Sequence, residues 1–291
     1  MQDTALTRRR IGVIGLGDLG AALASRLVTA GASVTGVRRG RDAPPGVELL
    51  RADLADASSL ADLPDDLEAL VVSVTPDRYD LDGYRATYLE GARNLAAALG
   101  GRRLTRVFWV SSTGVYGEQG GGDVDESTPA EPDSERGRVL LAAEQALSGQ
   151  DWPATAVRLA GIYGPGRNAL IDRVRSGRGV PAEPVHWTNR IHRDDAVELI
   201  VFLLARALAG DPVPEVVIGS DGAPTPRHEV MAWLAVQLGV TLTVSAEEAG
   251  SRAPSRRLWP RALVELGFSW RYPDYRAGYR AQLDALDRGR L

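Results

Sequence analysis

The chain contains no cysteine and no lysine, and these two absences exclude several kinds of chemistry. All 34 of its basic residues are arginines. Without cysteine there is no disulfide, no thiolate nucleophile and no cysteine-ligated zinc site. Without lysine there is no Schiff base, and no lysine to lower the pKa of a catalytic tyrosine. The three histidines, His186, His192 and His228, are too few to favour a multi-histidine centre, so no metal site is predicted.

The charge balance and the apolar runs limit the partners. The formal net charge is −4 over 291 residues, so the sequence predicts no binding to nucleic acid or to an anionic membrane surface. Residues 8–10 are arginines that precede an apolar segment, but Gly12 and Gly15 interrupt that segment, which is unlike a signal peptide. No run of about 18 apolar residues occurs, so we expect a cytoplasmic protein without a membrane span.

Apolar segments rich in β-branched residues alternate with amphipathic segments through the first half of the chain. This alternation is typical of βαβ units and predicts an α/β fold, a Rossmann-type doubly wound parallel sheet. The expected strands are Ile11–Ile14, Ala32–Val37, Val47–Leu50, Ala69–Val74, Arg106–Ser111 and Thr155–Leu159. The expected helices are Leu19–Ala30, Tyr84–Leu99, Arg136–Leu147, Asp195–Ala209 and His228–Leu238.

The second half is punctuated by prolines, which divide it into shorter elements. We therefore predict an NAD(P)-binding Rossmann domain over residues 1–160 and a small C-terminal substrate-binding lobe over most of residues 161–291. This lobe is expected to be interleaved with a return to the sheet around residues 185–220.

A glycine-rich turn follows the first predicted strand and precedes a long helix. Gly15, Gly17 and Gly20 fit the fingerprint GxGxxG of dinucleotide-binding proteins, with Asp18 and Leu19 at the start of the helix. The fingerprint needs a tight turn, then a residue without a side chain where the pyrophosphate approaches, then close helix packing. Because a strand and a helix flank the turn, we predict a cofactor site there. A glycine-rich turn that binds nothing would show the same spacing.

The charged residues after the second strand indicate which dinucleotide is bound. A site for NAD usually has an Asp or Glu about 20 residues after the turn, where it bonds the ribose hydroxyls. This chain has Arg38 and Arg39 instead, with no acid before Asp42. Arginines at this place would pair with the 2′-phosphate of NADP, so we expect NADP rather than NAD. A solvated basic loop would account for the same residues.

Four further segments resemble the extended short-chain dehydrogenase/reductase family, which includes nucleotide-sugar epimerases and dehydratases. They read SSTGVYG at 111–117, DESTP at 125–129, RLAGIYGPG at 158–166 and RIHRDD at 190–195. The resemblance implies a Rossmann-type fold with bound NAD(P), and a serine, Ser112, that hydrogen-bonds the substrate. It also implies that Asp53 and Leu54, after the third strand, contact the adenine, although an Asp there is also a common helix cap.

The sequence departs from this family at its catalytic tyrosine and lysine, which lie four residues apart on the helix after the serine segment. Alignment on LAAE at 141–144 places Arg136 at the tyrosine position and Leu140 at the lysine position. Arginine stays protonated and cannot act as a general base. Arg136 could neutralise an anionic substrate, or it could be an exposed arginine at a helix start. The pattern resembles the atypical branch of the family.

A small set of polar residues remains for catalysis and substrate binding. The catalytic candidates are Ser112 and Tyr116, although each would also suit a purely structural role. Asp194 and Asp195 are expected to cap the following helix. The resemblance implies that Tyr163, Arg167 and His192 lie at the substrate pocket, so these three residues and Arg136 are the candidates for substrate binding. His192 would equally suit a protein core.

Two functions follow from these features. The first is an NADP-dependent oxidoreductase or epimerase-like enzyme acting on a small polar or anionic substrate, with Ser112 orienting it and Tyr116 or water supplying a proton. The second is a non-catalytic NADP(H)-binding or redox-sensing protein, which the missing tyrosine and lysine favour. The resemblance also implies a homodimer formed through the helices at 84–99 and 136–147, although a core-facing apolar stripe explains their spacing equally well.

Overall fold

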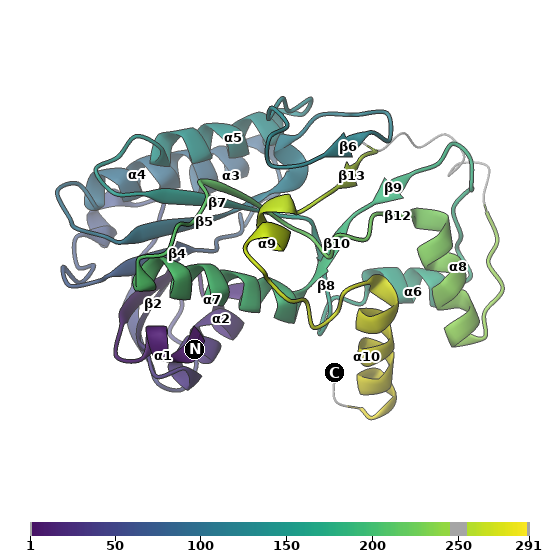
Figure 1. Ribbon diagram of the computed structural model, residues 1–291, viewed down its shortest axis with the longest axis horizontal. Coiled ribbons are helices and arrows are strands. Elements are labelled where there is room, and N and C mark those ends of the chain that lie inside the picture. The colour runs from purple at the N-terminus through teal and green to yellow at the C-terminus, as the bar shows by residue number, and fades with distance from the viewer. Residues whose placement is uncertain (1, 245–254, 290–291) are drawn as a thin grey trace. The chain divides into compact units, whose positions relative to one another are not determined.

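The computed structural model describes residues 2–244 and 255–289, and its central feature is a seven-stranded parallel sheet (Figure 1). The strand order is β11-β7-β5-β4-β1-β2-β3, so the chain runs outward from β1 in one direction and then outward from β4 in the other. This reversal defines a doubly wound sheet. The strands are β1 (Arg10–Ile14), β2 (Ser33–Arg38), β3 (Val47–Arg51), β4 (Ala69–Val72), β5 (Arg106–Ser112), β7 (Ala154–Leu159) and β11 (Val216–Gly219).

The central strands form because their apolar side chains are covered on both faces, as parallel sheets require. All four residues of β4 are buried, and β1 exposes only its first residue. Parallel pairing aligns Ile14 of β1 with Val37 of β2 and with Val72 of β4. The carboxyl ends of β4, β1 and β2 therefore meet at one edge of the sheet, the edge at which such folds bind ligands.

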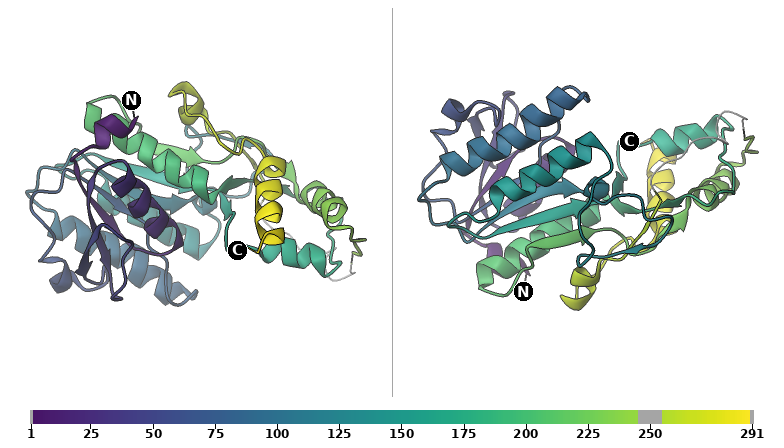
Figure 2. Two further views of the ribbon diagram at one scale, coloured as in Figure 1. Left: turned by 90° about the horizontal axis from the view of Figure 1, so that it is seen from below. Right: turned by 90° about the horizontal axis from the view of Figure 1, so that it is seen from above.

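Helices cover both faces of the sheet (Figure 1 and Figure 2). One face carries α2 (Asp18–Thr29) and α7 (Arg193–Ala209), and the other carries α3 (Leu81–Tyr84), α4 (Gly91–Ala98) and α5 (Glu135–Leu147). The prediction of an α/β Rossmann-type fold is confirmed. The predicted single helix over 84–99 is interrupted by a π-helical turn at Arg85–Glu90. Shorter helices are α1 (Gln2–Leu6), η1 (Ala57–Leu60) and η3 (Thr113–Val115).

The apolar stripes of α4 and α5 face the core. Leu95 and Leu99 are completely buried, together with Trp109 of β5 and Ala143 of α5. Leu140, at the position aligned with the family's lysine, is also buried. Core packing thus accounts for the apolar spacing of both helices, and a homodimer through them stays a prediction.

The chain divides into two compact units. The first comprises Met1–Tyr116, Ala130–Arg158 and Ala196–Val217, and the second comprises Gly117–Pro129, Leu159–Asp195 and Ile218–Leu291. The second unit is built from short strand pairs: β8 (Gly161–Tyr163) with β10 (Arg190–His192), β9 (Trp187–Thr188) with β12 (Thr225–Pro226), and β6 (Asp123–Val124) with β13 (Arg257–Leu258). Its helices are α6 (Ala169–Arg175), α8 (Arg227–Leu238), α9 (Arg261–Glu265) and α10 (Tyr275–Asp287).

The helices in residues 2–244 and 255–289 include none that is long and apolar enough to cross a membrane. Over the same ranges, no three His, Asp or Glu side chains are grouped so that they could hold a metal ion.

Candidate functional site

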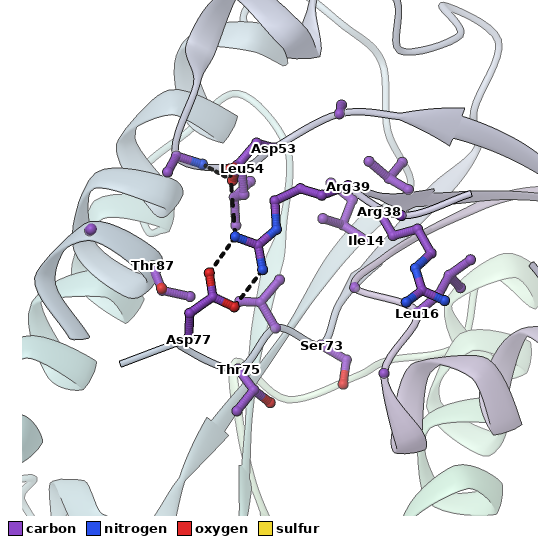
Figure 3. Close-up of a pocket in the computed structure, with 18 of the residues that line it drawn as sticks. Ile14, Leu16, Arg38, Arg39, Asp53, Leu54, Ser73, Thr75, Asp77 and Thr87 are labelled. Atoms are coloured by element: carbon purple, nitrogen blue, oxygen red, sulfur yellow. Dashed lines mark hydrogen bonds and ion pairs between the residues drawn. The ribbon is translucent and has the colours of Figure 1, made fainter. Parts of the chain in front are cut away.

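A pocket of about 520 Å³ lies at the carboxyl ends of β1 to β4, within the first unit (Figure 3). It is lined by the turn after β1, by the ends of β2 and β3, and by the segment after β4. Among the residues predicted to bind the cofactor, Asp18, Leu19 and Gly20 form the first turn of α2 beside the pocket. The other six line the pocket itself: Gly15, Gly17, Arg38, Arg39, Asp53 and Leu54.

The three glycines of the turn differ in the space around their α-carbons. Gly15 has φ +92°, and a Cβ there would lie 2.2 Å from the carbonyl oxygen of Ser73. A Cβ on Gly20 would lie 1.8 Å from the carbonyl oxygen of Gly15, so this glycine lets α2 pack against the turn. A Cβ on Gly17 would meet no described atom within 4 Å. The fold itself therefore needs Gly15 and Gly20, whereas the space beside Gly17 is left for something else.

That space suits a diphosphate. Gly17 is the N-cap residue of α2, a helix of 12 residues. The first N–H groups of a helix have no carbonyl partner within it, and the helix dipole makes this end electropositive. An anion can approach such an end closely where no side chain intervenes. The residues present therefore fit the pyrophosphate of a dinucleotide.

Arg39 is bound by two carboxylates of the pocket (Figure 3). Its Nη2 donates to Asp77 Oδ1 over 2.6 Å and its Nη1 donates to Asp77 Oδ2, so the contact is bidentate. Asp53 Oδ2 lies 3.9 Å from the same Nη1. The hydrogen bonds between Arg39 and Asp77 raise the pKa of the arginine and lower that of the carboxyl. Both groups are therefore charged, and the charge of Arg39 is already offset.

Arg38 points away from Arg39, towards Leu16 (Figure 3). Its Nη1 donates to the backbone carbonyl of Asp42 over 3.0 Å, and its guanidinium lies against Gly40. No carboxylate in the part of the chain that the structure describes forms an ion pair with Arg38. The positive charge of Arg38 is thus the uncompensated one at the end of β2.

Asp53 lines the pocket and also serves the local fold. Its Oδ1 accepts from the backbone N–H of Ala55 over 3.0 Å, which closes a turn after β3. The sequence allowed Asp53 to be a helix cap, but the residue that caps the following helix, η1, is Asp56. Its carboxylate accepts from the N–H of Ser58. The adenine contact proposed for Asp53 and Leu54 stays a prediction.

A buried ion pair links β7 to α5, and its contacts include Ser111 of β5. Arg158 Nη2 lies 2.7 Å from Glu144 Oε2, and both side chains are only 7% exposed. The Nε of Arg158 donates to both carboxylate oxygens, and the hydroxyl of Ser111 donates to the same carboxylate. The sequence contained both residues within its family-like segments, LAAE and RLAGIYGPG, but gave no signal that the two would meet.

Of the two catalytic candidates, Tyr116 contacts this ion pair, and Ser112 lies at the end of β5. Ser112 is partly exposed at the end of β5, and its Oγ accepts from the N–H of Gly114 over 3.1 Å, which caps η3. Tyr116 is 2% exposed, and its hydroxyl accepts from Arg158 Nη1 over 2.9 Å. The Arg158 guanidinium also lies 5.0 Å from the centre of the Tyr116 ring. These contacts favour a structural role for Tyr116, and a catalytic role for either residue stays a prediction.

Arg136 is exposed in the first turn of α5. Its Nη2 donates to the carbonyl of Tyr79, and its guanidinium lies 5.2 Å from the centre of the Tyr84 ring. Arg136 therefore contacts its own unit, and its proposed contact with an anionic substrate is untested. The position aligned with the family's catalytic tyrosine is thus occupied by the exposed Arg136, and the position aligned with its lysine by the buried Leu140.

In the second unit, Tyr163 and His192 lie in an aromatic cluster. Tyr163 is 4% exposed, and its ring centre lies 4.5 Å from that of Tyr279 and 5.3 Å from that of His192. His192 Nδ1 accepts from the N–H of Asp194 over 3.2 Å, and its ring lies 4.0 Å from that of Tyr272. Burial lowers the pKa of His192 to about 4, so its imidazole is neutral at pH 7. These contacts favour core roles, and substrate binding by either residue stays a prediction.

The remaining candidates of this unit differ in exposure. Arg167 is exposed, in the turn between β8 and α6. Asp195 is buried, and its carboxylate accepts from the N–H groups of Arg271 and Tyr272 over 2.8 and 2.9 Å. Asp194 and Asp195 both lie in the first turn of α7, as expected, but the Asp195 carboxylate does not cap the helix, because its oxygens bind a distant backbone segment instead. Burial also raises the pKa of this carboxyl.

Comparison with known proteins agrees with this geometry. Residues 11–219 match the profile of the NAD dependent epimerase/dehydratase family. Protein YeeZ of Escherichia coli K12 is 32% identical over 280 residues, which cover 91% of this chain and 97% of YeeZ. A protein from Methylobacillus flagellatus, provisionally named as an NAD-dependent epimerase/dehydratase, is 36% identical with a TM-score of 0.82, over 97% of this chain and all of that one.

The Bordetella bronchiseptica enzyme WbmG, solved in complex with NAD, shares the fold at 20% identity, with a TM-score of 0.77 over 98% of this chain and 96% of WbmG. The family match and the two more similar relatives cover most of the chain, as the sequence resemblance implied. The chain belongs to the NAD-dependent epimerase/dehydratase family.

Proposed function

We propose that this chain binds NADP(H) in the pocket at the carboxyl ends of β1 to β4. The observation that carries the proposal is the uncompensated guanidinium of Arg38 at the end of β2. An NAD site usually has an acid at this place. Because the glycine turn suits either dinucleotide, the choice between them depends on the charge beside the adenosine ribose. Asp53 and Asp77 offset Arg39, so Arg38 supplies the positive charge that a 2′-phosphate would need.

Replacing Arg38 by Ala is expected to weaken NADPH binding about 20-fold, because a hydrogen bond to a charged group contributes about 1.5–3 kcal/mol. NADH affinity should change by less than about twofold, as for a surface substitution without a specific contact. Isothermal titration with each cofactor measures both values. The matched control is Arg41→Ala, which removes an exposed arginine of the same loop that does not line the pocket. An equal loss for both cofactors, or no loss, contradicts the assignment of Arg38.

Turnover is a separate question, on which two features point in opposite directions. Family membership and the partly exposed Ser112 at the end of β5 favour an oxidoreductase or epimerase-like enzyme for a small polar or anionic substrate. Arg136 and Leu140 favour a binding or redox-sensing protein without turnover, because neither can supply the proton that hydride transfer needs. We propose the enzyme as the primary function and the non-catalytic protein as the alternative.

Labelled cofactor separates these two functions. NADPH carrying deuterium at one or the other face of the nicotinamide would be incubated with acidic aldehydes, ketones and keto forms of nucleotide sugars, each of which has a carbonyl carbon that can accept the hydride, and the products analysed by mass spectrometry. We expect deuterium in one product class, and a rate about a hundredfold lower for Ser112→Ala if the serine stabilises the reacting oxygen. Tight binding of NADPH with no transfer to any class would instead favour the non-catalytic protein.

A further inference from the structure

We propose that Asp77 is a specificity-determining residue of the cofactor pocket, which limits the preference for NADPH over NADH by holding Arg39 in an ion pair. The inference rests on the proposed function, because it places the 2′-phosphate of NADPH near Arg38 and Arg39 in this pocket. It names a residue of the segment after β4, where the sequence gave no candidate.

The position of the pair suggests that it affects the cofactor. Arg39 follows β2, and Asp77 follows β4 by a few residues; these strands flank β1 in the sheet. The pair therefore links two segments on either side of the strand that leads into the glycine turn. Both side chains line the pocket, and Figure 3 shows their charged groups facing each other. A ligand that fills this pocket therefore lies near the pair.

The geometry of the ion pair hinders Arg39 from binding the 2′-phosphate. A guanidinium can bind a carboxylate or a phosphate end-on, through its two outer nitrogens, or side-on, through Nε and one outer nitrogen, as Arg158 binds Glu144. In Arg39 both outer nitrogens already donate to Asp77. To bind a phosphate end-on, Arg39 has to leave Asp77, and the freed carboxylate then repels the phosphate. A phosphate bound side-on would share an outer nitrogen with Asp77 and would lie beside the same repelling carboxylate. Asp77 thus opposes NADPH twice and has no comparable effect on the neutral ribose of NADH.

The exposure of the pair sets the size of this effect. Arg39 is 56% and Asp77 is 64% exposed. Ion pairs this exposed shift an equilibrium by no more than about fivefold, because water screens them. The uncompensated Arg38 is therefore expected to determine the cofactor preference, and Asp77 to adjust it. Asp53 is a weaker competitor, since its nearest oxygen lies 3.9 Å from Arg39.

The test is Asp77→Asn, a nearly isosteric change that removes the negative charge. We expect NADPH to bind roughly fivefold more tightly and NADH affinity to stay within about twofold of wild type, as measured by isothermal titration at low salt. The gain should shrink at about 1 M salt, where charges are screened within about 3 Å. In an Arg39→Ala background, the part of the gain that comes from releasing the arginine should disappear, and only the part that comes from removing the repulsion between the Asp77 carboxylate and the phosphate should remain. The matched control is Asp42→Asn, which removes an exposed acid of the neighbouring loop that forms no ion pair among the described residues.

The outcomes separate this inference from the proposed function. An NADPH affinity that is unchanged or lower in Asp77→Asn, or an equal gain in Asp42→Asn, overturns the role of Asp77. If Arg38→Ala still weakens the binding of NADPH selectively, the proposed function stands without this role of Asp77. If Arg38→Ala affects both cofactors equally, the proposed function fails, whatever Asp77→Asn shows. Because Asp77 is exposed, Asp77→Asn should unfold at the wild-type temperature, and a thermal scan checks this.

Discussion

Gly17→Val is expected to weaken the binding of NADPH and NADH by at least about a hundredfold each, while the free energy of unfolding falls by no more than about 1 kcal/mol. The backbone of Gly17 has φ −79° and ψ −162°, an extended conformation open to valine. A Cβ there would also meet no described atom within 4 Å, so the fold accommodates it. The added side chain would occupy the place where the pyrophosphate approaches the start of α2. Titration calorimetry and urea denaturation measure the two effects.

The contrast with Gly20 provides the control. A Cβ on Gly20 would lie 1.8 Å from the carbonyl oxygen of Gly15, so Gly20→Ala must displace α2 or the turn. Gly20→Ala should therefore lower stability by more than Gly17→Val does, whereas the main effect of Gly17→Val should be on cofactor affinity. Wild-type affinity of Gly17→Val for both cofactors would show that the dinucleotide does not cross this turn.

Glu144→Ala is expected to lower the free energy of unfolding by about 3–5 kcal/mol, because it leaves the buried charge of Arg158 without a partner. Both side chains of this ion pair are only 7% exposed. The substitution also removes the acceptor of the Ser111 hydroxyl. Since Arg158 in turn holds the Tyr116 hydroxyl, the effect should spread to the segment that carries Ser112. Urea denaturation at pH 7 measures the loss.

Two further variants test whether the loss of stability comes from the buried charge or merely from replacing a glutamate of α5. Glu135 on the same helix forms an exposed ion pair with Arg138, so Glu135→Ala should cost less than about 0.5 kcal/mol. The double variant Glu144→Leu with Arg158→Met should recover most of the stability, because buried ion pairs can often be replaced by apolar side chains of similar volume. A loss below about 1 kcal/mol for Glu144→Ala would mean that water reaches and solvates Arg158.

The sheet and the cofactor turn could be predicted from the sequence because the signals for them are local. Apolar segments of four to six residues and amphipathic segments alternate along the first half, and each element forms where its pattern lies. Gly15, Gly17, Arg38 and Arg39 were found for a related reason. They lie at the carboxyl end of β1 or β2 or within three residues of it, and the ends of neighbouring parallel strands necessarily meet at one edge.

The parts that could not be predicted depend on contacts between segments distant in the sequence. Asp77 meets Arg39 across 38 positions, and nothing in either neighbourhood indicates the pairing. Asp195 resembled a helix cap because it lies in the first turn of α7, yet its carboxylate binds backbone 76 residues away. The burial of His192 could not be predicted either, since no sequence pattern distinguishes a single histidine in the core from one in a binding site.

Selective binding of NADP(H) through Arg38 is tested most directly by the dissociation constants of NADPH and NADH, measured for the wild-type chain and for Arg38→Ala in one buffer. We expect the wild-type chain to bind NADPH at least about tenfold more tightly than NADH, and Arg38→Ala to bind the two cofactors within about twofold of each other. Equal affinities in the wild-type chain, or a preference that survives the loss of Arg38, would contradict this role of the arginine.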